Sequence, residues 1–224
     1  MEYFIYCRDR PGSGVLRSEL VEAHWAFMDR YADEMIARGP TLTSDGMAAT
    51  GSVHIVDLPD GEAAHVFAFD EPNYKAGVYG EVLVRRWSNT LGRTMWQFAG
   101  SMAGYHRFLI IAHGRSGVTA GRDALHREHH HYLDQGYRDR LIACGPLLSE
   151  DGARWRGTAI LAELPNRSAA DALIAKEPYA QAGLYERIEV HDWRFGGAAP
   201  DLARRSPGVF GGSLMPVGVY QSGG

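Results

Sequence analysis

The chain has 224 residues, of which 45% are hydrophobic, so it is long enough to form one large or two small hydrophobic cores. Its formal net charge of −4 and the lack of a basic stripe argue against nucleic acid as a partner. No apolar run approaches the ~18 residues of a membrane span, and no signal peptide is recognisable. We therefore expect no membrane contact. Cys7 and Cys144 are too few for a disulfide framework, so we expect a protein of the reducing cytoplasm.

The first predicted element is a buried strand at Tyr3–Cys7, which is short, apolar and rich in aromatic residues and Ile. A turn rich in Gly, Pro and Ser follows. A helix is predicted next, because one face collects residues at helical spacing: Leu20, His24, Phe27, Met28, Tyr31 and Met35. Gly39-Pro40 is expected to end this helix.

Two short strands are predicted on either side of Asp45-Gly46, a pair that favours a hairpin turn. A second helix is expected from Gly61 to Glu71-Pro72, and a final strand at Glu81–Trp87. The resulting order, β-α-β-β-α-β, is that of the ferredoxin-like unit.

The second half of the chain repeats the first in the same order. FIYCRD at Phe4–Asp9 matches LIIAHG at Leu109–Gly114, and ARGPTLTSDG at Ala37–Gly46 matches ACGPLLSEDG at Ala143–Gly152. The repeat predicts the same elements again, marked by Phe108–Ala112, Gly145-Pro146, Asp151-Gly152, Arg167, Glu177-Pro178 and Arg187–Trp193.

The repeat sets the expected organisation. One unit leaves one face of its sheet without helices, so we expect two units packed sheet to sheet as a pseudo-dimer within one α+β chain. The predicted parts are a first unit at residues 1–95, a linker at 96–104, a second unit at 105–196 and a Gly/Pro-rich tail at 197–224.

These motifs resemble the YciI-like, or YCII-related, family. The resemblance rests on a strand ending in Asp, a helix carrying His, then GP, DG, an E/D-P segment and a closing V-x-x-W strand. It implies a dimeric α/β-barrel fold of ferredoxin-like units and an Asp/His active site. It also implies kinship with an enzyme that eliminates halide from a chlorinated hydroxyquinol. The family's Asp and His fall on Asp9 and His24.

The Asp9/His24 pair suggests proton transfer. Imidazole titrates near neutrality, and a neighbouring carboxylate fixes its tautomer and stabilises its cation. The alternative is that His24 is a core histidine and Asp9 begins a turn. In the second unit the matching positions are Gly114 and His129, so no carboxylate stands beside that histidine in the family pattern.

Three further residues are predicted to bind substrate: Arg8, which could attract an anion, His113, which could partly replace the missing carboxylate, and His129. His126 and His130 have the i, i+4 spacing of metal ligands, but neighbouring histidines point to different sides of a helix and no HExxH motif is present. We therefore expect no metal and no cofactor.

The leading hypothesis is a cofactor-independent lyase or isomerase that acts on an activated carbonyl or phenolic compound, in secondary metabolism. The alternative is a small-molecule-binding or structural protein that keeps the barrel without catalysis. The expected partner is a small-molecule substrate, and homo-oligomer formation is left open.

Overall fold

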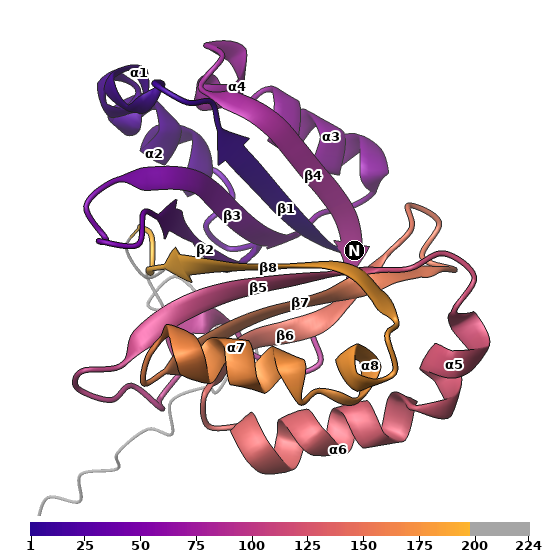
Figure 1. Cartoon of the computed structure of the whole chain (residues 1–224). Coiled ribbons are helices and arrows are strands. Elements are labelled where there is room, and N and C mark those ends of the chain that lie inside the picture. The colour runs from indigo at the N-terminus through magenta and orange to yellow at the C-terminus, as the bar shows by residue number, and fades with distance from the viewer. Residues whose placement is uncertain (198–224) are drawn as a thin grey trace, which may run out of the picture.

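The computed structural model describes residues 1–197 and contains two units with the same order of elements (Figure 1). The elements of the first unit are β1 (Glu2–Asp9), α1 (Gly14–Glu19), α2 (Val21–Asp29), β2 (Met35–Leu42), β3 (Ala49–Asp57), α3 (Gly61–Phe69), α4 (Pro72–Lys75) and β4 (Tyr79–Trp87). Those of the second are β5 (His106–Gly114), α5 (Thr119–Ala124), α6 (His126–Tyr137), β6 (Leu141–Leu148), β7 (Trp155–Leu164), α7 (Arg167–Ala175), α8 (Pro178–Gln181) and β8 (Tyr185–Trp193). A short 3₁₀ turn, Met95–Gln97, lies between them.

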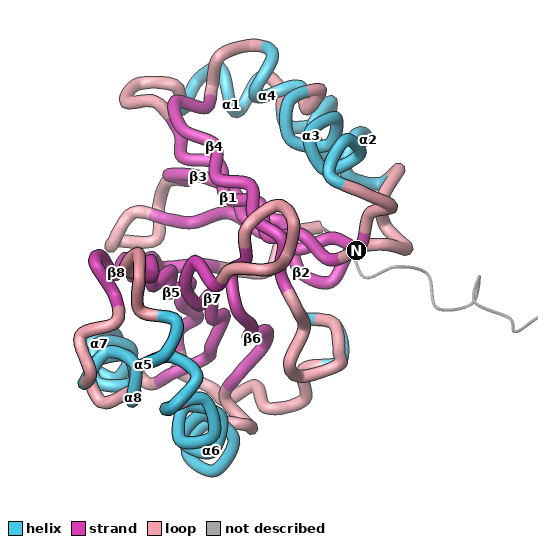
Figure 2. Tube along the Cα trace, turned by 90° about the vertical axis from the view of Figure 1, so that its right-hand side faces the viewer, coloured by secondary structure: helices cyan, strands magenta, loops and turns pink. Residues whose placement is uncertain are grey.

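The strands form one closed antiparallel barrel in the order β1-β3-β2-β8-β5-β7-β6-β4. Figure 2 shows the strands in the middle and the helices of the two units on opposite outer sides. The units meet at two narrow seams, where β2 pairs with β8 at Thr41 and Leu42, and β4 pairs with β6 at Arg86 and Trp87. The predicted α+β pseudo-dimer of ferredoxin-like units is confirmed.

The strands alternate between two apolar environments. One face of each half points into the barrel, where Phe4, Ile55, Leu109 and Leu161 belong to a single core shared by both units. The other face packs under the helices of its own unit and forms two separate clusters. This double burial follows from the period of two along a strand and explains the uninterrupted apolar runs Tyr3–Cys7 in β1 and Phe108–Ala112 in β5.

The helix ends were predicted wrongly. Gly39-Pro40 and Gly145-Pro146 do not stop helices but lie within β2 and β6. The first helix is in fact two, with a break at Leu20, and Met35 begins β2. Pro40 lies at the end of the β2–β8 seam, where β8 itself pairs only with Thr41 and Leu42, and its carbonyl accepts a hydrogen bond from the backbone N–H of Arg194 at 3.3 Å.

The hairpin prediction is confirmed in both units. Gly46 and Gly152 sit in the β2–β3 and β6–β7 turns with φ of 71° and 75°, a conformation that favours glycine. The second helices begin at Gly61 and Arg167 as predicted, but they end at Phe69 and Ala175. One-turn helices, α4 and α8, then begin at the proline of each Glu-Pro pair.

The tail predicted at residues 197–224 lies outside the described residues apart from Gly197. Within residues 1–197, none of the helices has the length and apolar character that crossing a membrane requires.

Candidate functional site

His24 lies on α2 with a side chain only 13% exposed, and its ring is held by a buried carboxylate. Nδ1 of His24 lies 2.5 Å from Oε1 of Glu71, whose side chain is 3% exposed. Because an ionised carboxylate can only accept, the proton of this bond sits on Nδ1. Nε2 of His24 is thereby left as the basic nitrogen, and it makes no hydrogen bond to another described residue.

Glu71 is fixed by the local sequence. It caps α4, its Oε2 accepts from the backbone N–H of Tyr74 at 3.0 Å, and Pro72 occupies the first helical position. Proline suits that position because its missing N–H would be unpaired there in any case. The cap uses one carboxylate oxygen and leaves the other for His24, so a Glu-Pro turn sets the position of the imidazole.

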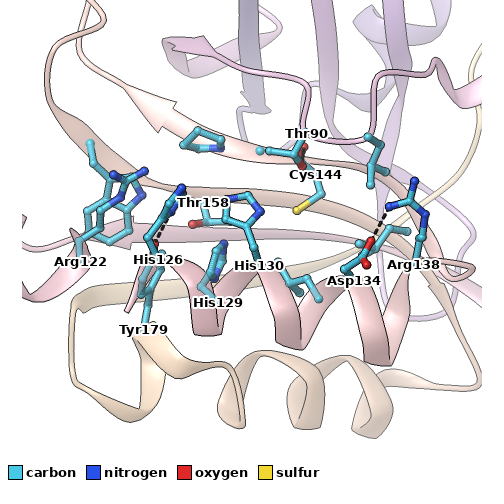
Figure 3. Close-up of a pocket in the computed structure, with 16 residues that line it drawn as sticks. Thr90, Arg122, His126, His129, His130, Asp134, Arg138, Cys144, Thr158 and Tyr179 are labelled. Carbon is cyan, nitrogen blue, oxygen red and sulfur yellow. Dashed lines mark hydrogen bonds and ion pairs between the residues drawn. The ribbon is translucent and has the colours of Figure 1, made fainter. Parts of the chain in front are cut away.

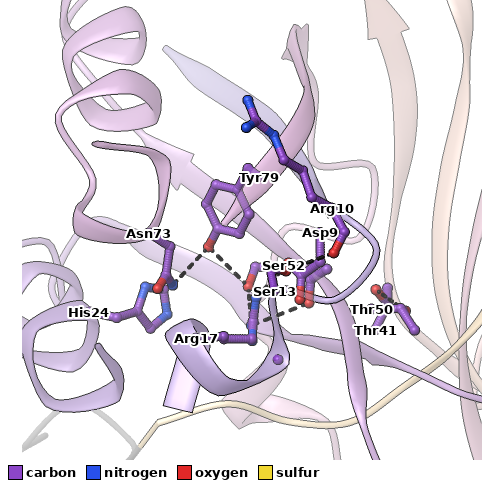
Figure 4. Close-up of polar contacts among 12 residues, drawn as sticks. Asp9, Arg10, Ser13, Arg17, His24, Thr41, Thr50, Ser52, Asn73 and Tyr79 are labelled. Atoms are coloured by element: carbon purple, nitrogen blue, oxygen red, sulfur yellow. Dashed lines mark hydrogen bonds and ion pairs between the residues drawn. The ribbon is translucent and has the colours of Figure 1, made fainter. Parts of the chain in front are cut away.

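Asp9 has a different partner from the one expected (Figure 4). Its Oδ1 accepts from Nη1 of Arg17 at 2.8 Å, and no hydrogen bond joins it to His24. The expectation that Asp9 orients the imidazole is therefore wrong; that carboxylate is Glu71. Burial raises the pKa of Asp9 despite the nearby Arg17 charge, and Oδ2 of Asp9 is buried without a hydrogen-bond partner.

Arg17 links Asp9 to a row of buried hydroxyl groups. Its Nη2 donates to Oγ of Ser52 at 2.6 Å, and the Tyr79 hydroxyl donates to the same oxygen at 3.3 Å. The Asn73 amide in turn donates to the Tyr79 hydroxyl at 3.2 Å. Figure 4 shows this chain running from Asp9 toward the helix that carries His24. The network holds the guanidinium in one orientation.

His24 and Arg17 line one cavity of about 240 Å³. Its wall consists of Arg17, Val21, His24, Trp25, Met28, Arg38, Gly39, Pro40, Ala49, Ser52, His54, Asn73, Arg194, Phe195, Gly196 and Gly197. The last four residues follow β8, so the second unit completes the cavity of the first. The lining has three arginines and no carboxylate, although Arg17 pairs with Asp9 and Arg38 with Asp29 behind it. Guanidinium groups that face the cavity favour a substrate oxygen that carries or develops negative charge.

His54 adds a neutral imidazole to this wall. Its ring lies 5.7 Å from the ring of His24, and its side chain is buried. Burial lowers the pKa of His54 well below its usual value, and the charges of His24, Arg38 and Arg17 act in the same direction. His54 therefore stays neutral at neutral pH, and it can bind a substrate without adding a positive charge.

The second unit keeps the histidine and its carboxylate but fills the space around them. His129 pairs with Glu177 through Nδ1, and Glu177 caps α8 through the N–H of Ala180. The ring of Tyr179 stacks on His129 with centroids 4.1 Å apart. Figure 3 shows His129 and Tyr179 with His126 in this region. The second cavity measures about 60 Å³, against 240 Å³ for the first.

The loss of space has an identifiable cause. Aligning the units places Trp155 opposite Ala49 and Tyr179 opposite Asn73. A Cβ atom on Gly114 would lie 2.5 Å from the Trp155 ring. The ring thus occupies the place of the side chain that Asp9 has in the first unit. The second site is a packed copy, and His129 lines only its small remaining cavity.

Arg8 and His113, predicted to bind substrate, meet elsewhere. Both contact the carboxylate of Glu189: Arg8 through Nη2, and His113 through Nε2 at 2.8 Å. Neither residue lines the His24 cavity. The hydrogen bonds to His113 and His191, and the charge of Arg8, hold the pKa of Glu189 far below its usual range. These residues form an ionic link between the two units.

The histidine run on α6 does not gather further ligands. The rings of His126 and His130 lie 4.3 Å apart, yet within residues 1–197 no three His, Cys, Asp or Glu side chains are grouped to hold a metal ion.

Glu71, Arg17 and His54 are site residues that were not predicted from the sequence. Glu71 had a usable signal, because Glu-Pro recurs at the same place in both units, but it was interpreted as a helix end. Arg17 recurs as Arg122 at the matching position of the second unit, and this repeat was an equally usable signal. His54 had no such signal in the sequence, because its counterpart in the second unit is Ile160 and a single histidine in an apolar strand is typical of a core residue.

Comparison with known proteins shows that one protein-family model matches both units. The model of the YCII-related domain matches residues 1–88 and, a second time, residues 106–194. No curated protein matches the chain.

Solved structures share the architecture. A chlorite dismutase variant from Candidatus Nitrospira defluvii has a TM-score of 0.56 at 12% identity, covering 88% of this chain and 91% of the dismutase. At that identity the likeness concerns the fold alone. The 5-chloro-2-hydroxyhydroquinone dehydrochlorinase of Burkholderia phenoliruptrix AC1100, in complex with 2,5-dihydroxybenzoquinone, is 33% identical. That match covers 39% of this chain and 94% of the dehydrochlorinase, with a TM-score of 0.37.

Proposed function

The chain belongs to the YCII-related family in two fused copies, and we propose that it is a cofactor-independent enzyme that moves a proton on a small carbonyl or phenolic substrate. The observation that carries the proposal is the His24–Glu71 pair, with a basic Nε2, in the wall of a 240 Å³ cavity. The scarcity of cysteines supports a reducing compartment such as the cytoplasm.

The proposed roles follow from the geometry. Nε2 of His24 takes a proton from the substrate, and the Glu71 carboxylate stabilises the imidazolium that forms. The electron pair released moves onto a substrate oxygen beside the Arg17 guanidinium, which Asp9 and Ser52 hold in place. Asp9 then acts as a positioning residue for Arg17.

The enolate or phenolate formed in that step can react further in two ways. In an elimination, the electron pair returns from the oxygen to form a carbon–carbon double bond, the leaving group departs from the neighbouring carbon with its bonding electrons, and His24 passes its proton to the leaving group or to water. In an isomerisation, His24 returns the proton to a different atom of the substrate. Three lining arginines without a lining carboxylate suit the enolate or phenolate common to both routes.

The first test needs no knowledge of the leaving group. Enolisable carbonyl compounds and phenols are incubated with the protein in deuterated water, and deuterium uptake at carbon is followed by NMR. We expect His24→Gln to lower the exchange rate by about 10²- to 10⁴-fold, because the base is lost. Glu71→Gln should lower it as well, since the amide can hold the wrong imidazole tautomer.

The second unit provides matched controls. His129→Gln and Glu177→Gln remove the same groups from the packed site, and they should leave the exchange rate within a few-fold of wild type. Equal exchange by wild type and His24→Gln would reject the proposal. Loss confined to His129→Gln would assign catalysis to the second unit. Saturable binding of a compound that no variant or wild type converts would favour the binding-protein alternative.

A further inference from the structure

A hollow of about 500 Å³, distinct from the cavities at His24 and His129, opens beside the β6–β7 hairpin. It shares no lining residue with the His24 cavity. Three arginines from three segments line it: Arg85 of β4, Arg154 of the hairpin and Arg156 of β7. Ser116 adds a hydroxyl group to the same wall, whereas the Ser149 hydroxyl donates to Asp151 and His113 contacts Glu189. Guanidinium and hydroxyl donors in one hollow are the groups that bind oxyanions.

Comparing the two units shows that a counter-charge is missing on this side. Arg85 aligns with His191, and His191 lies 3.2 Å from the Glu189 carboxylate. Glu189 itself aligns with Leu83, which lines the hollow. The second unit therefore has a histidine with a half-buried carboxylate beside it, whereas the first unit has an arginine with an aliphatic side chain in place of that carboxylate.

The other two arginines are likewise peculiar to this side. Arg154 and Arg156 align with Ala48 and Thr50, so the corresponding place in the barrel has no positive charge from these positions. The hydroxyl of Thr50 instead donates to Thr41 at 3.0 Å. The cluster of cations is thus a feature of one half and not of the fold.

The carboxylates of the hollow do not neutralise the arginines by direct pairing. Glu150 and Glu186 line it, but both are exposed, and among residues 1–197 neither forms an ion pair with Arg85, Arg154 or Arg156. Arg85 uses Nη1 to donate to the Val84 carbonyl at 2.9 Å, which leaves further N–H groups of its guanidinium.

The guanidinium groups of Arg85 and Arg156 also repel each other. Burial lowers the pKa of Arg85, and the positive charge of Arg156 lowers it further. An anion placed between the two groups would remove this repulsion and accept hydrogen bonds from both.

We propose that this hollow binds a small oxyanion, the phosphate or carboxylate group of a metabolite, between Arg85 and Arg156. The site stands apart from the His24 cavity, and the proposal does not depend on the catalytic role of His24.

The test titrates the full chain with inorganic phosphate and, in a second arm, with malonate, while sodium chloride keeps the ionic strength constant. Calorimetry should show saturable binding of at least one probe by wild type. Tighter phosphate binding would indicate a phosphoryl ligand, and tighter malonate binding a carboxylate. In Arg85→Gln/Arg156→Gln, affinity should fall by about tenfold or more, because the two charged donors are gone.

A matched control separates a built site from general charge. Arg127→Gln removes a positive charge from a side chain that is 91% exposed on α6, and it should leave the affinity unchanged. Equal loss of affinity in Arg127→Gln and in the double variant would overturn the proposal, as would the absence of saturable binding to wild type. A thermal scan of the double variant without phosphate checks folding: a melting temperature at or above that of wild type is expected, since the repulsion is gone.

Discussion

At the scale of single residues, the pairing of His24 with Glu71 changes the family-based interpretation of the site. Asp9 and His24 were readable from the sequence because each sits at a recognisable place in a motif. Their partners were not, because the bond from His24 spans 47 positions in the chain and depends on how α4 is capped. Hydrogen-bond partners that lie far apart in the chain can be identified only from the tertiary fold, whereas the sequence motif alone identifies the residue types.

His54 gives a prediction about pH. Its pKa is lowered in the folded state, so above its usual value of 6.5 folded and unfolded chains both hold it neutral. As the pH falls below 6.5, the unfolded chain binds a proton that the folded chain excludes. The free energy of unfolding should then fall by up to ~1.4 kcal/mol per pH unit from this group.

The measurement is urea denaturation of wild type and His54→Ile at pH 7, 6 and 5. Isoleucine is the residue that the second unit has at this position, Ile160. We expect the variant to lose less stability than wild type between pH 7 and pH 5. Parallel curves for the two proteins would show that His54 already binds its proton in the folded state.

At the scale of elements, the hairpins and most strands could be predicted, but the helix ends and the first residues of β2 and β6 could not. Alternation and Asp-Gly turns are local signals, and they placed the hairpins correctly at Gly46 and Gly152. Gly39-Pro40 resembles a helix stop, yet it lies in β2 because a neighbouring segment approaches there. A Cβ on Gly39 would lie 2.0 Å from the Arg194 carbonyl oxygen. That constraint comes from the other unit and cannot be seen within the first.

The β5 strand gives a prediction about packing. Gly114→Ala places a methyl group 2.5 Å from the Trp155 ring, so it should destabilise the protein by about 1–3 kcal/mol. In a Trp155→Ala background the same substitution should cost much less, because the obstructing ring is gone. Chemical denaturation of the four proteins of this cycle measures the coupling.

Gly136→Ala serves as the reference for that cycle. Gly136 lies in α6 with open space around its Cβ position, so alanine should leave the stability unchanged or raise it by about 0.5–1 kcal/mol. Additive costs for Gly114→Ala and Trp155→Ala would mean that the ring moves aside freely and does not keep the second site closed.

At the scale of the whole molecule, the two seams make each unit a part of its neighbour's site. Gly39 contacts the segment after β8, and Gly145 contacts the segment after β4, where a Cβ would lie 1.9 Å from the Ser88 carbonyl oxygen. Gly39→Ala and Gly145→Ala should therefore destabilise the protein by similar amounts, about 1–3 kcal/mol each.

Their effects on activity should differ. The segment displaced by Gly39→Ala lines the 240 Å³ cavity, whereas the segment displaced by Gly145→Ala borders the 60 Å³ one. We expect only Gly39→Ala to lower deuterium exchange under conditions where both variants are folded. Equal losses would indicate that general destabilisation, and not the shape of the first cavity, limits the reaction.

The connection between β4 and β5, residues 88–105, has a consequence for assembly. A barrel made from two separate subunits would fall apart on dilution, but here its two halves share one backbone, so its closure does not depend on protein concentration. If the unit with the open His24 cavity and the unit with the packed His129 site were separate subunits, they would form two kinds of homodimer as well as the heterodimer. Covalent fusion fixes a ratio of one open pocket to one packed pocket in every molecule, which independent subunits could reach only by recognising each other.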